Sequence, residues 1–197
     1  EILRIIDEIK KHRIENLLAL KGDPDIRTRK NSDFSNSLDL LPLIPRDISK
    51  GIALYPASHP DTPLLKEIDL IKKKIELGAD FGITQLFLDI DEFENFLSLL
   101  QKNKIELPVI AGILPITSHD VFNNIVAKVK KISIPKKYKE ILKKYPYKEQ
   151  KNDFFKASME FTGRLIEKLL SIKEVSGIHF FTLNKNTGTE YLIKNLN

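Results

Sequence analysis

The sequence of 197 residues contains no cysteine, which excludes disulfide bonds and thiolate chemistry anywhere in the chain. It also contains no apolar run that approaches the roughly 18 residues of a membrane-spanning helix. The opening residues, EILRIIDEIKKH, are charged and amphipathic and do not resemble a secretory signal. These absences predict a cytoplasmic protein that has no membrane partner.

Several motifs that mark catalytic or ligand-binding sites are also missing. The sequence has no nucleophile elbow, no phosphate-binding loop and no glycine fingerprint of a dinucleotide site. Its four histidines are His12, His59, His119 and His179, and their spacing does not fit a set of metal ligands. We therefore expect no bound metal.

Positive charge is concentrated in one segment of the chain. The formal net charge is +5, but residues 128–151 hold ten lysines and two glutamates, a local balance of +8. Arginine is scarce, and lysines spread over helices usually form a solvated surface. A nucleic-acid partner is therefore not expected, and a lysine-rich nucleic-acid module is the least favoured class of function.

The chain alternates amphipathic helices with short apolar strands. Ile68, Ile71 and Ile75 recur at helical spacing before Gly78, a residue type that often ends a helix. The predicted strands are 14–20, 51–55, 83–88, 108–114 and 177–183. The predicted helices are 2–12, 38–46, 64–77, 91–103, 118–129, 136–145, 152–171 and 187–195. This alternation predicts an α/β fold.

The predicted strands have the composition of parallel strands that helices cover on both faces. We expect one domain, residues 1–197. Two architectures agree with the pattern: an open doubly wound sheet, or part of an eight-stranded barrel. Five strands cannot close such a barrel, which typically takes about 250 residues. The sequence begins on a helix, as expected for a β/α series that starts in its middle.

Polar residues gather where the predicted strands end, the edge at which α/β folds bind ligands. They are Lys21, Gly22, Asp23, Tyr55, His59, Gln85, Thr182, Asn184 and Lys185. Asp23 has a simpler interpretation as a turn residue, and His59 as a loop residue. Burying an unpaired amide costs roughly 1–3 kcal/mol, so Gln85 either bonds to neighbouring backbone or faces a ligand.

Five segments, taken together and in this order, resemble one family. They are 16–24 (NLLALKGDP), 53–60 (ALYPASHP), 73–87 (KKIELGADFGITQLF), 108–116 (PVIAGILPI) and 177–184 (GIHFFTLN). Each segment is a weak signal alone, but together they cover nearly the whole chain. On these motifs the sequence resembles the methylenetetrahydrofolate reductase family.

The resemblance implies a fold and an activity. The fold is a (β/α)₈ TIM barrel that holds FAD, of which this sequence carries about five of the eight β/α units. The activity is reduction of 5,10-methylenetetrahydrofolate to 5-methyltetrahydrofolate with NAD(P)H by a ping-pong mechanism, in one-carbon metabolism and methionine synthesis. The flavin carries the hydride chemistry and the protein supplies position and electrostatics. A homo-oligomer is also implied.

The resemblance also assigns roles to individual residues. It implies that Asp23 and Gln85 are catalytic and contact the substrate, and that Lys185 contacts the folate. The residues implied to bind FAD are Lys21, Gly22, Asp23, Tyr55, His59, Glu67, Lys73 and Lys74. A carboxylate at position 23 can accept N–H bonds from the pterin, and cations complement the FAD phosphates.

The sequence departs from the family pattern at several of these positions. Lys21 and Lys185 stand where the family has arginine, so the planar two-pronged donor is lost. Glu67 replaces an aspartate, Leu70 an Asn or His, and Ile125 a phenylalanine of a bacterial homologue. These changes are expected to weaken ligand contacts.

The largest expected departure is an absence. The family's first three strands and their catalytic glutamate, a general acid, have no counterpart in this sequence. The rival hypothesis is therefore a catalytically incomplete remnant that binds flavin or a partner chain. A further hypothesis is that the lysines of 128–151 attract polyglutamylated folate.

Overall fold

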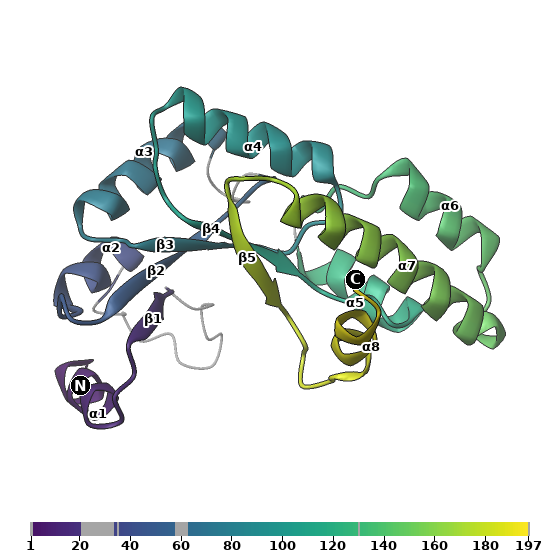
Figure 1. Ribbon diagram of the computed structural model, residues 1–197, viewed down its shortest axis with the longest axis horizontal. Coiled ribbons are helices and arrows are strands. Elements are labelled where there is room, and N and C mark those ends of the chain that lie inside the picture. Colours follow the sequence, from purple (N-terminus) through teal and green to yellow (C-terminus); the bar gives the residue numbers. More distant parts are fainter. Residues whose placement is uncertain (1, 21–33, 35, 58–62, 130, 197) are drawn as a thin grey trace.

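The computed structural model describes residues 2–20, 34, 36–57, 63–129 and 131–196, and it confirms the α/β class (Figure 1). The strands are β1 (Asn16–Ala19), β2 (Ser49–Leu54), β3 (Phe81–Thr84), β4 (Val109–Ile113) and β5 (Val175–Phe180). The α-helices are α1 (Ile2–Lys11), α2 (Ser37–Leu40), α3 (Leu64–Glu76), α4 (Ile90–Lys102), α5 (His119–Lys128), α6 (Lys136–Lys144), α7 (Lys151–Leu170) and α8 (Thr187–Asn195). Two 3₁₀ turns, η1 (Leu41–Leu43) and η2 (Lys148–Gln150), lie between them.

The five strands form one parallel sheet in the order β1-β2-β3-β4-β5. Each described strand pairs with the next one along the chain, in registers such as Leu54↔Thr84 and Ile83↔Ile110. A doubly wound sheet reverses its strand order at a switch point. The described strands show no such reversal, so the doubly wound alternative is wrong.

Helices cover one face of this sheet more completely than the other. Figure 1 shows α3 and α4 on the same side of β2 and β3. Strand residues on the helix side, such as Leu54 and Ala111, are fully buried. Residues on the opposite side are less covered: Leu18 of β1 is 39% exposed and Ile83 of β3 is half-buried. The expectation of strands covered on both faces is therefore wrong for this part of the sheet.

A second apolar cluster anchors the lysine-rich segment. Tyr138 of α6 is fully buried, and its hydroxyl hydrogen-bonds to that of Ser158 on α7 at 2.9 Å. The Ser158 hydroxyl donates to the Ile116 carbonyl beyond β4 at 2.7 Å. Burial raises the pKa of Tyr138, so its hydroxyl stays protonated in this network. Tyr138 is thus the fully buried anchor of α6, and Ile141 and Leu142 of the same helix pack against the cluster around it.

Candidate functional site

The carboxyl ends of β2, β3, β4 and β5 lie at one edge of the sheet, which we call the rim. Parallel α/β sheets bind ligands at this edge. The residues that follow the four strands are Tyr55, Gln85, Leu114 and Phe181. Because Leu54 and Thr84 are register partners, Tyr55 and Gln85 leave neighbouring strands side by side.

Gln85 lies just beyond its strand, not inside it. The sequence predicted a strand at 83–88, but β3 ends at Thr84 and residues 85–88 form the loop before α4. Its backbone N–H donates to the Leu54 carbonyl at 2.7 Å. Its side-chain Oε1 accepts the N–H of Leu86 at 2.9 Å. Gln85 is therefore a half-buried rim residue that adjacent backbone holds in place.

A close contact between β3 and β4 holds the strand end that precedes Gln85. The Thr84 hydroxyl, which is buried, accepts the N–H of Gly112 at 2.8 Å. A Cβ on Gly112 would lie 2.2 Å from the Thr84 carbonyl oxygen and 2.7 Å from the Phe181 ring. Only glycine allows this approach. The sequence indicates Thr84 as one of the polar residues near the strand ends, but it gives no sign of a hydrogen-bond partner 28 residues away.

A cavity of about 200 Å³ opens where β4 and β5 end. Its lining mixes apolar and polar side chains, the usual composition of a small-molecule site. The lining residues that matter here are Leu114, Thr117, Asn124, Phe181, Leu183 and Lys185. Lys185, predicted to contact the substrate, therefore reaches this cavity.

The turn that places Lys185 has a specific backbone geometry. Leu183 and Asn184 have φ values of 48° and 60°, and the Lys185 N–H donates to the Thr182 carbonyl at 2.8 Å. Left-handed backbone is uncommon for leucine. Gly188, at the start of α8, would bring a Cβ within 2.6 Å of Pro115. The turn and this tight packing direct the cationic side chain to the ends of β4 and β5.

The predicted FAD residues on α3 divide between its surface and its interior. Lys73 is exposed, whereas Glu67 is 2% and Lys74 8% exposed. Burial lowers the pKa of Lys74, and the attraction of Glu67 partly opposes that shift. Buried charges are tolerated when they are paired. The Glu67 carboxylate thus attracts the Lys74 ammonium inside the protein, and of these three residues only Lys73 is exposed.

Of the remaining predicted residues, only Tyr55 lies in the part of the chain that the structure describes. Tyr55 is half-buried at the rim next to Gln85. Lys21, Gly22, Asp23 and His59 lie outside the described residues.

Within the described ranges no group of three His, Cys, Asp or Glu side chains could hold a metal ion, and no helix is long and apolar enough to cross a membrane.

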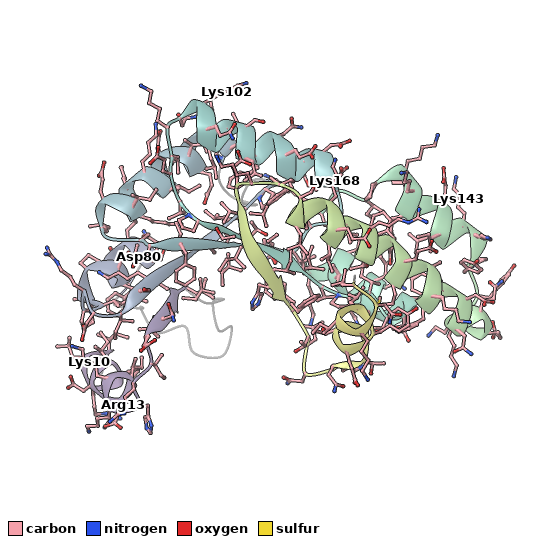
Figure 2. All side chains as sticks on the ribbon, in the orientation of Figure 1. Lys10, Arg13, Asp80, Lys102, Lys143 and Lys168 are labelled. Atoms are coloured by element: carbon pink, nitrogen blue, oxygen red, sulfur yellow. The ribbon has the colours of Figure 1, made fainter. Side chains whose placement is uncertain are left out.

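The lysine-rich segment lines a different hollow. A groove of about 850 Å³ lies between the start of α4, α6 and α7, and it shares no lining residue with the rim cavity. Figure 2 places Lys143 of α6 at the opposite end of the molecule from Lys10 of α1. The charged lining residues are Lys136, Lys137, Arg164, Lys168, Asp89, Asp91, Glu140 and Glu160. Equal numbers of each sign give this groove no preference for a polyanion.

A sequentially ordered parallel sheet with amide, aromatic and cationic side chains at its carboxyl edge defines an α/β fold whose polar residues lie at the edge where such folds bind ligands. The family model described as methylenetetrahydrofolate reductase matches residues 1–197. The chain therefore belongs to the methylenetetrahydrofolate reductase family.

Individual relatives agree with this assignment. Methylenetetrahydrofolate reductase 2 of Saccharomyces cerevisiae is 31% identical over 93% of this chain and 32% of its own length. A probable methylenetetrahydrofolate reductase (NADPH) of Caenorhabditis elegans is 29% identical over 100% of this chain and 30% of its length. The Buchnera aphidicola 5,10-methylenetetrahydrofolate reductase is 29% identical over 88% of this chain and 58% of its length. The chain thus spans about a third of the first two relatives.

A solved structure shares the fold. It is an uncharacterised protein from Clostridium thermocellum that binds two copies of 5-methyl-5,6,7,8-tetrahydrofolic acid. The TM-score is 0.56 at 20% sequence identity, over 92% of this chain and 70% of that chain. At this identity the likeness concerns the fold alone.

Proposed function

We propose that this chain supplies the flavin- and folate-binding rim of an FAD-dependent reductase that converts 5,10-methylenetetrahydrofolate to 5-methyltetrahydrofolate with NAD(P)H. The observation that carries the proposal is the continuity of the rim. Gln85, Gly112, Phe181 and the cavity reached by Lys185 follow one another across the ends of β3, β4 and β5. Family membership supports a folate ligand for this surface.

We also propose that the sheet is an arc of a (β/α)₈ barrel. Two features support the arc: the strand order is sequential, and α3 and α4 lie on the same side of β2 and β3. In a barrel the other face lines the interior and is filled by side chains. The partly exposed Leu18 and Ile83 lie on that face.

The rim fits a flat ring system with polar edges. A Cβ on Gly112 would meet the Thr84 carbonyl and the Phe181 ring, so β3, β4 and the segment after β5 stay closely packed there. Tyr55 and Gln85 follow neighbouring strands at the rim. By resemblance, Lys73 would offer a surface cation to the FAD pyrophosphate, and Lys21, Gly22, Asp23, His59, Glu67 and Lys74 would complete the set that holds FAD. The bound flavin would supply the hydride chemistry.

The chain's own residues would position the substrate for that chemistry. Gln85 directs N–H donors at the ligand, and the Lys185 ammonium pairs with a folate carboxylate. Asp23 accepts N–H bonds from the pterin. In a ping-pong cycle the nicotinamide and the folate occupy this rim in turn, so the same Gln85 amide serves both.

The test is a flavin assay on the purified protein. We expect a yellow protein that NADH or NADPH bleaches, and reoxidation by 5,10-methylenetetrahydrofolate once the segment that carries the family's catalytic glutamate is supplied. A protein that binds no flavin and oxidises no NAD(P)H would overturn the proposal. Binding of 5-methyltetrahydrofolate without NAD(P)H oxidation would instead favour the second candidate, a folate- or flavin-binding remnant.

Three further expectations belong to the proposal. They are a single domain over residues 1–197, a homo-oligomer and a cytoplasmic location. Analytical ultracentrifugation checks the oligomer, and limited proteolysis checks the single domain. Fractionation of the source cells checks the location.

A further inference from the structure

The pairing of β3 with β4 is short, and a side chain extends it. The register covers Gly82↔Val109 and Ile83↔Ile110. Beyond these pairs the Gly112 N–H donates to the Thr84 hydroxyl at 2.8 Å. One hydroxyl therefore bridges the two strands at the point where they reach the rim.

Because this bridge is buried, it requires a hydroxyl group at position 84. Thr84 is 1% exposed, and Gly112 is buried beside it. A buried N–H that loses its acceptor cannot turn to water instead. The hydroxyl is therefore required at this position, and an isosteric valine would leave the Gly112 N–H without an acceptor.

The next residue, Gln85, is held in one orientation. Its backbone N–H is fixed to the Leu54 carbonyl of β2. The Leu86 N–H is a donor, so the atom of the Gln85 amide that faces it must be Oε1. The amide nitrogen therefore lies on the side away from Leu86, and its N–H groups take no part in this contact.

We infer that Thr84 is a positioning residue that acts through Gln85, and this inference rests on the proposed function. The hydroxyl bridge to Gly112 fixes the end of β3 against β4, while the bond to Leu54 fixes it against β2. Gln85 then offers its N–H groups in a set direction. The ligand groups it fits are acceptors on a flat ring system, such as a ring carbonyl oxygen or a ring nitrogen.

The experiment is a double-mutant cycle read by calorimetric titration with 5-methyltetrahydrofolate. The holoprotein is compared with Thr84→Val, Gln85→Ala and the double variant, and Thr84→Ser is the conservative control. We expect Thr84→Val to weaken binding about tenfold, which corresponds to about 1.4 kcal/mol. We expect Thr84→Ser to bind within about twofold of the parent, because it keeps the acceptor.

The decisive result is the effect of Thr84→Val in the Gln85→Ala background. If Thr84 acts through Gln85, adding Thr84→Val to Gln85→Ala weakens the binding of 5-methyltetrahydrofolate by less than about twofold. An equal loss in both backgrounds, or no loss in either, overturns the inference. If Thr84→Val does not fold, Thr84→Ala replaces it, and the same two outcomes decide.

Failure of the proposed function has a different signature. In that case the unaltered protein does not bind 5-methyltetrahydrofolate, and Gln85→Ala changes nothing. The inference about Thr84 then falls with the folate site. Tight binding by the unaltered protein, a loss for Gln85→Ala and none for Thr84→Val would remove the inference and keep the proposed function.

Discussion

The two edges of the sheet use polar side chains in opposite ways. At the amino edge, the buried Lys50 ammonium donates to the Leu41 carbonyl at 3.1 Å. The Lys50 N–H donates to Asp80 Oδ2 at 2.8 Å, and the Asp80 N–H returns a bond to the Lys50 carbonyl. Figure 2 labels Asp80 near the start of β3. These groups satisfy one another within the protein.

At the carboxyl edge, some polar groups form hydrogen bonds within the protein and others are left for a ligand. The Thr84 hydroxyl accepts the Gly112 N–H inside the sheet, and the Gln85 side-chain oxygen accepts the Leu86 N–H. The Gln85 amide nitrogen is left for a ligand at the rim. Lys185 reaches a cavity. The comparison teaches that one edge stabilises the sheet and the other binds, so substitutions at the two edges should have separable effects.

The largest effect is expected from Gly112→Ala, where the added Cβ would meet backbone at 2.2 Å. Overpacking of this kind costs about 3 kcal/mol, and the same substitution should abolish folate binding because it displaces β3. Gly177→Ala in β5 is the matched control, since a Cβ there has nothing within 4 Å. Urea titration measures the free energy of unfolding of both variants. Equal stability of the two variants would show that the close approach of β3 and β4 is not required.

The next effect concerns the amino edge. Lys50→Met keeps the buried stem and removes the donor to the Leu41 carbonyl. We expect a loss of about 2 kcal/mol in the free energy of unfolding, with an unchanged dissociation constant for 5-methyltetrahydrofolate. Lys72→Met is the control, because Lys72 bonds to Asn103 in a less buried setting. A weakened folate affinity in Lys50→Met would contradict the division between the edges.

A smaller effect is expected from the buried pair on α3, and it depends on pH. Burial lowers the pKa of Lys74 from 10.5, so between the lowered value and 10.5 the unfolded chain binds more protons than the folded one. Stability then rises with pH through that window and is reduced below it. Glu67→Gln with Lys74→Met should remove this rise. Unfolding free energies measured at closely spaced pH values up to 10.5 check the slope, and an unchanged slope in the double variant would remove Lys74 as its source.

Much of the fold could be predicted from the sequence because helix spacing and apolar runs are local signals. The predicted helix at 187–195 coincides with α8, and the predicted helix at 64–77 ends one residue after α3. The predicted strand at 83–88 was displaced because apolar residues continue to Leu88, whereas β3 is defined by its pairing with β2 and β4. Composition does not report where pairing stops.

The candidate site could be predicted only in part, for the same reason. Gln85 and Lys185 were found because they are polar residues at strand ends. The bond between Thr84 and Gly112 joins residues 28 apart, and the pairing of Glu67 with Lys74 depends on which face of α3 is buried. The first depends on strand pairing, for which a single sequence carries no signal. For the second, the spacing of Ile68 and Ile71 marks the buried face of α3, but it does not predict that two charged side chains are buried beside it. The polyglutamate hypothesis for residues 128–151 stays a prediction, because the groove beside α6 is lined by only two of these lysines, Lys136 and Lys137.

The smallest effect is expected at Lys185, where the comparison of the edges is tested without disturbing the sheet. Lys185→Arg supplies a planar two-pronged donor, so we expect about threefold tighter binding of 5-methyltetrahydrofolate. Lys185→Met should weaken binding about tenfold, and neither variant should change the unfolding midpoint because the side chain is exposed. Lys194→Met is the matched control: it removes the same charge from α8, where Lys194 pairs with Glu190 at 2.6 Å outside the cavity. Equal weakening by Lys185→Met and Lys194→Met would mean that a diffuse positive field attracts the ligand. A loss confined to Lys185 would assign recognition to the carboxyl edge, where the side chain contacts the ligand directly.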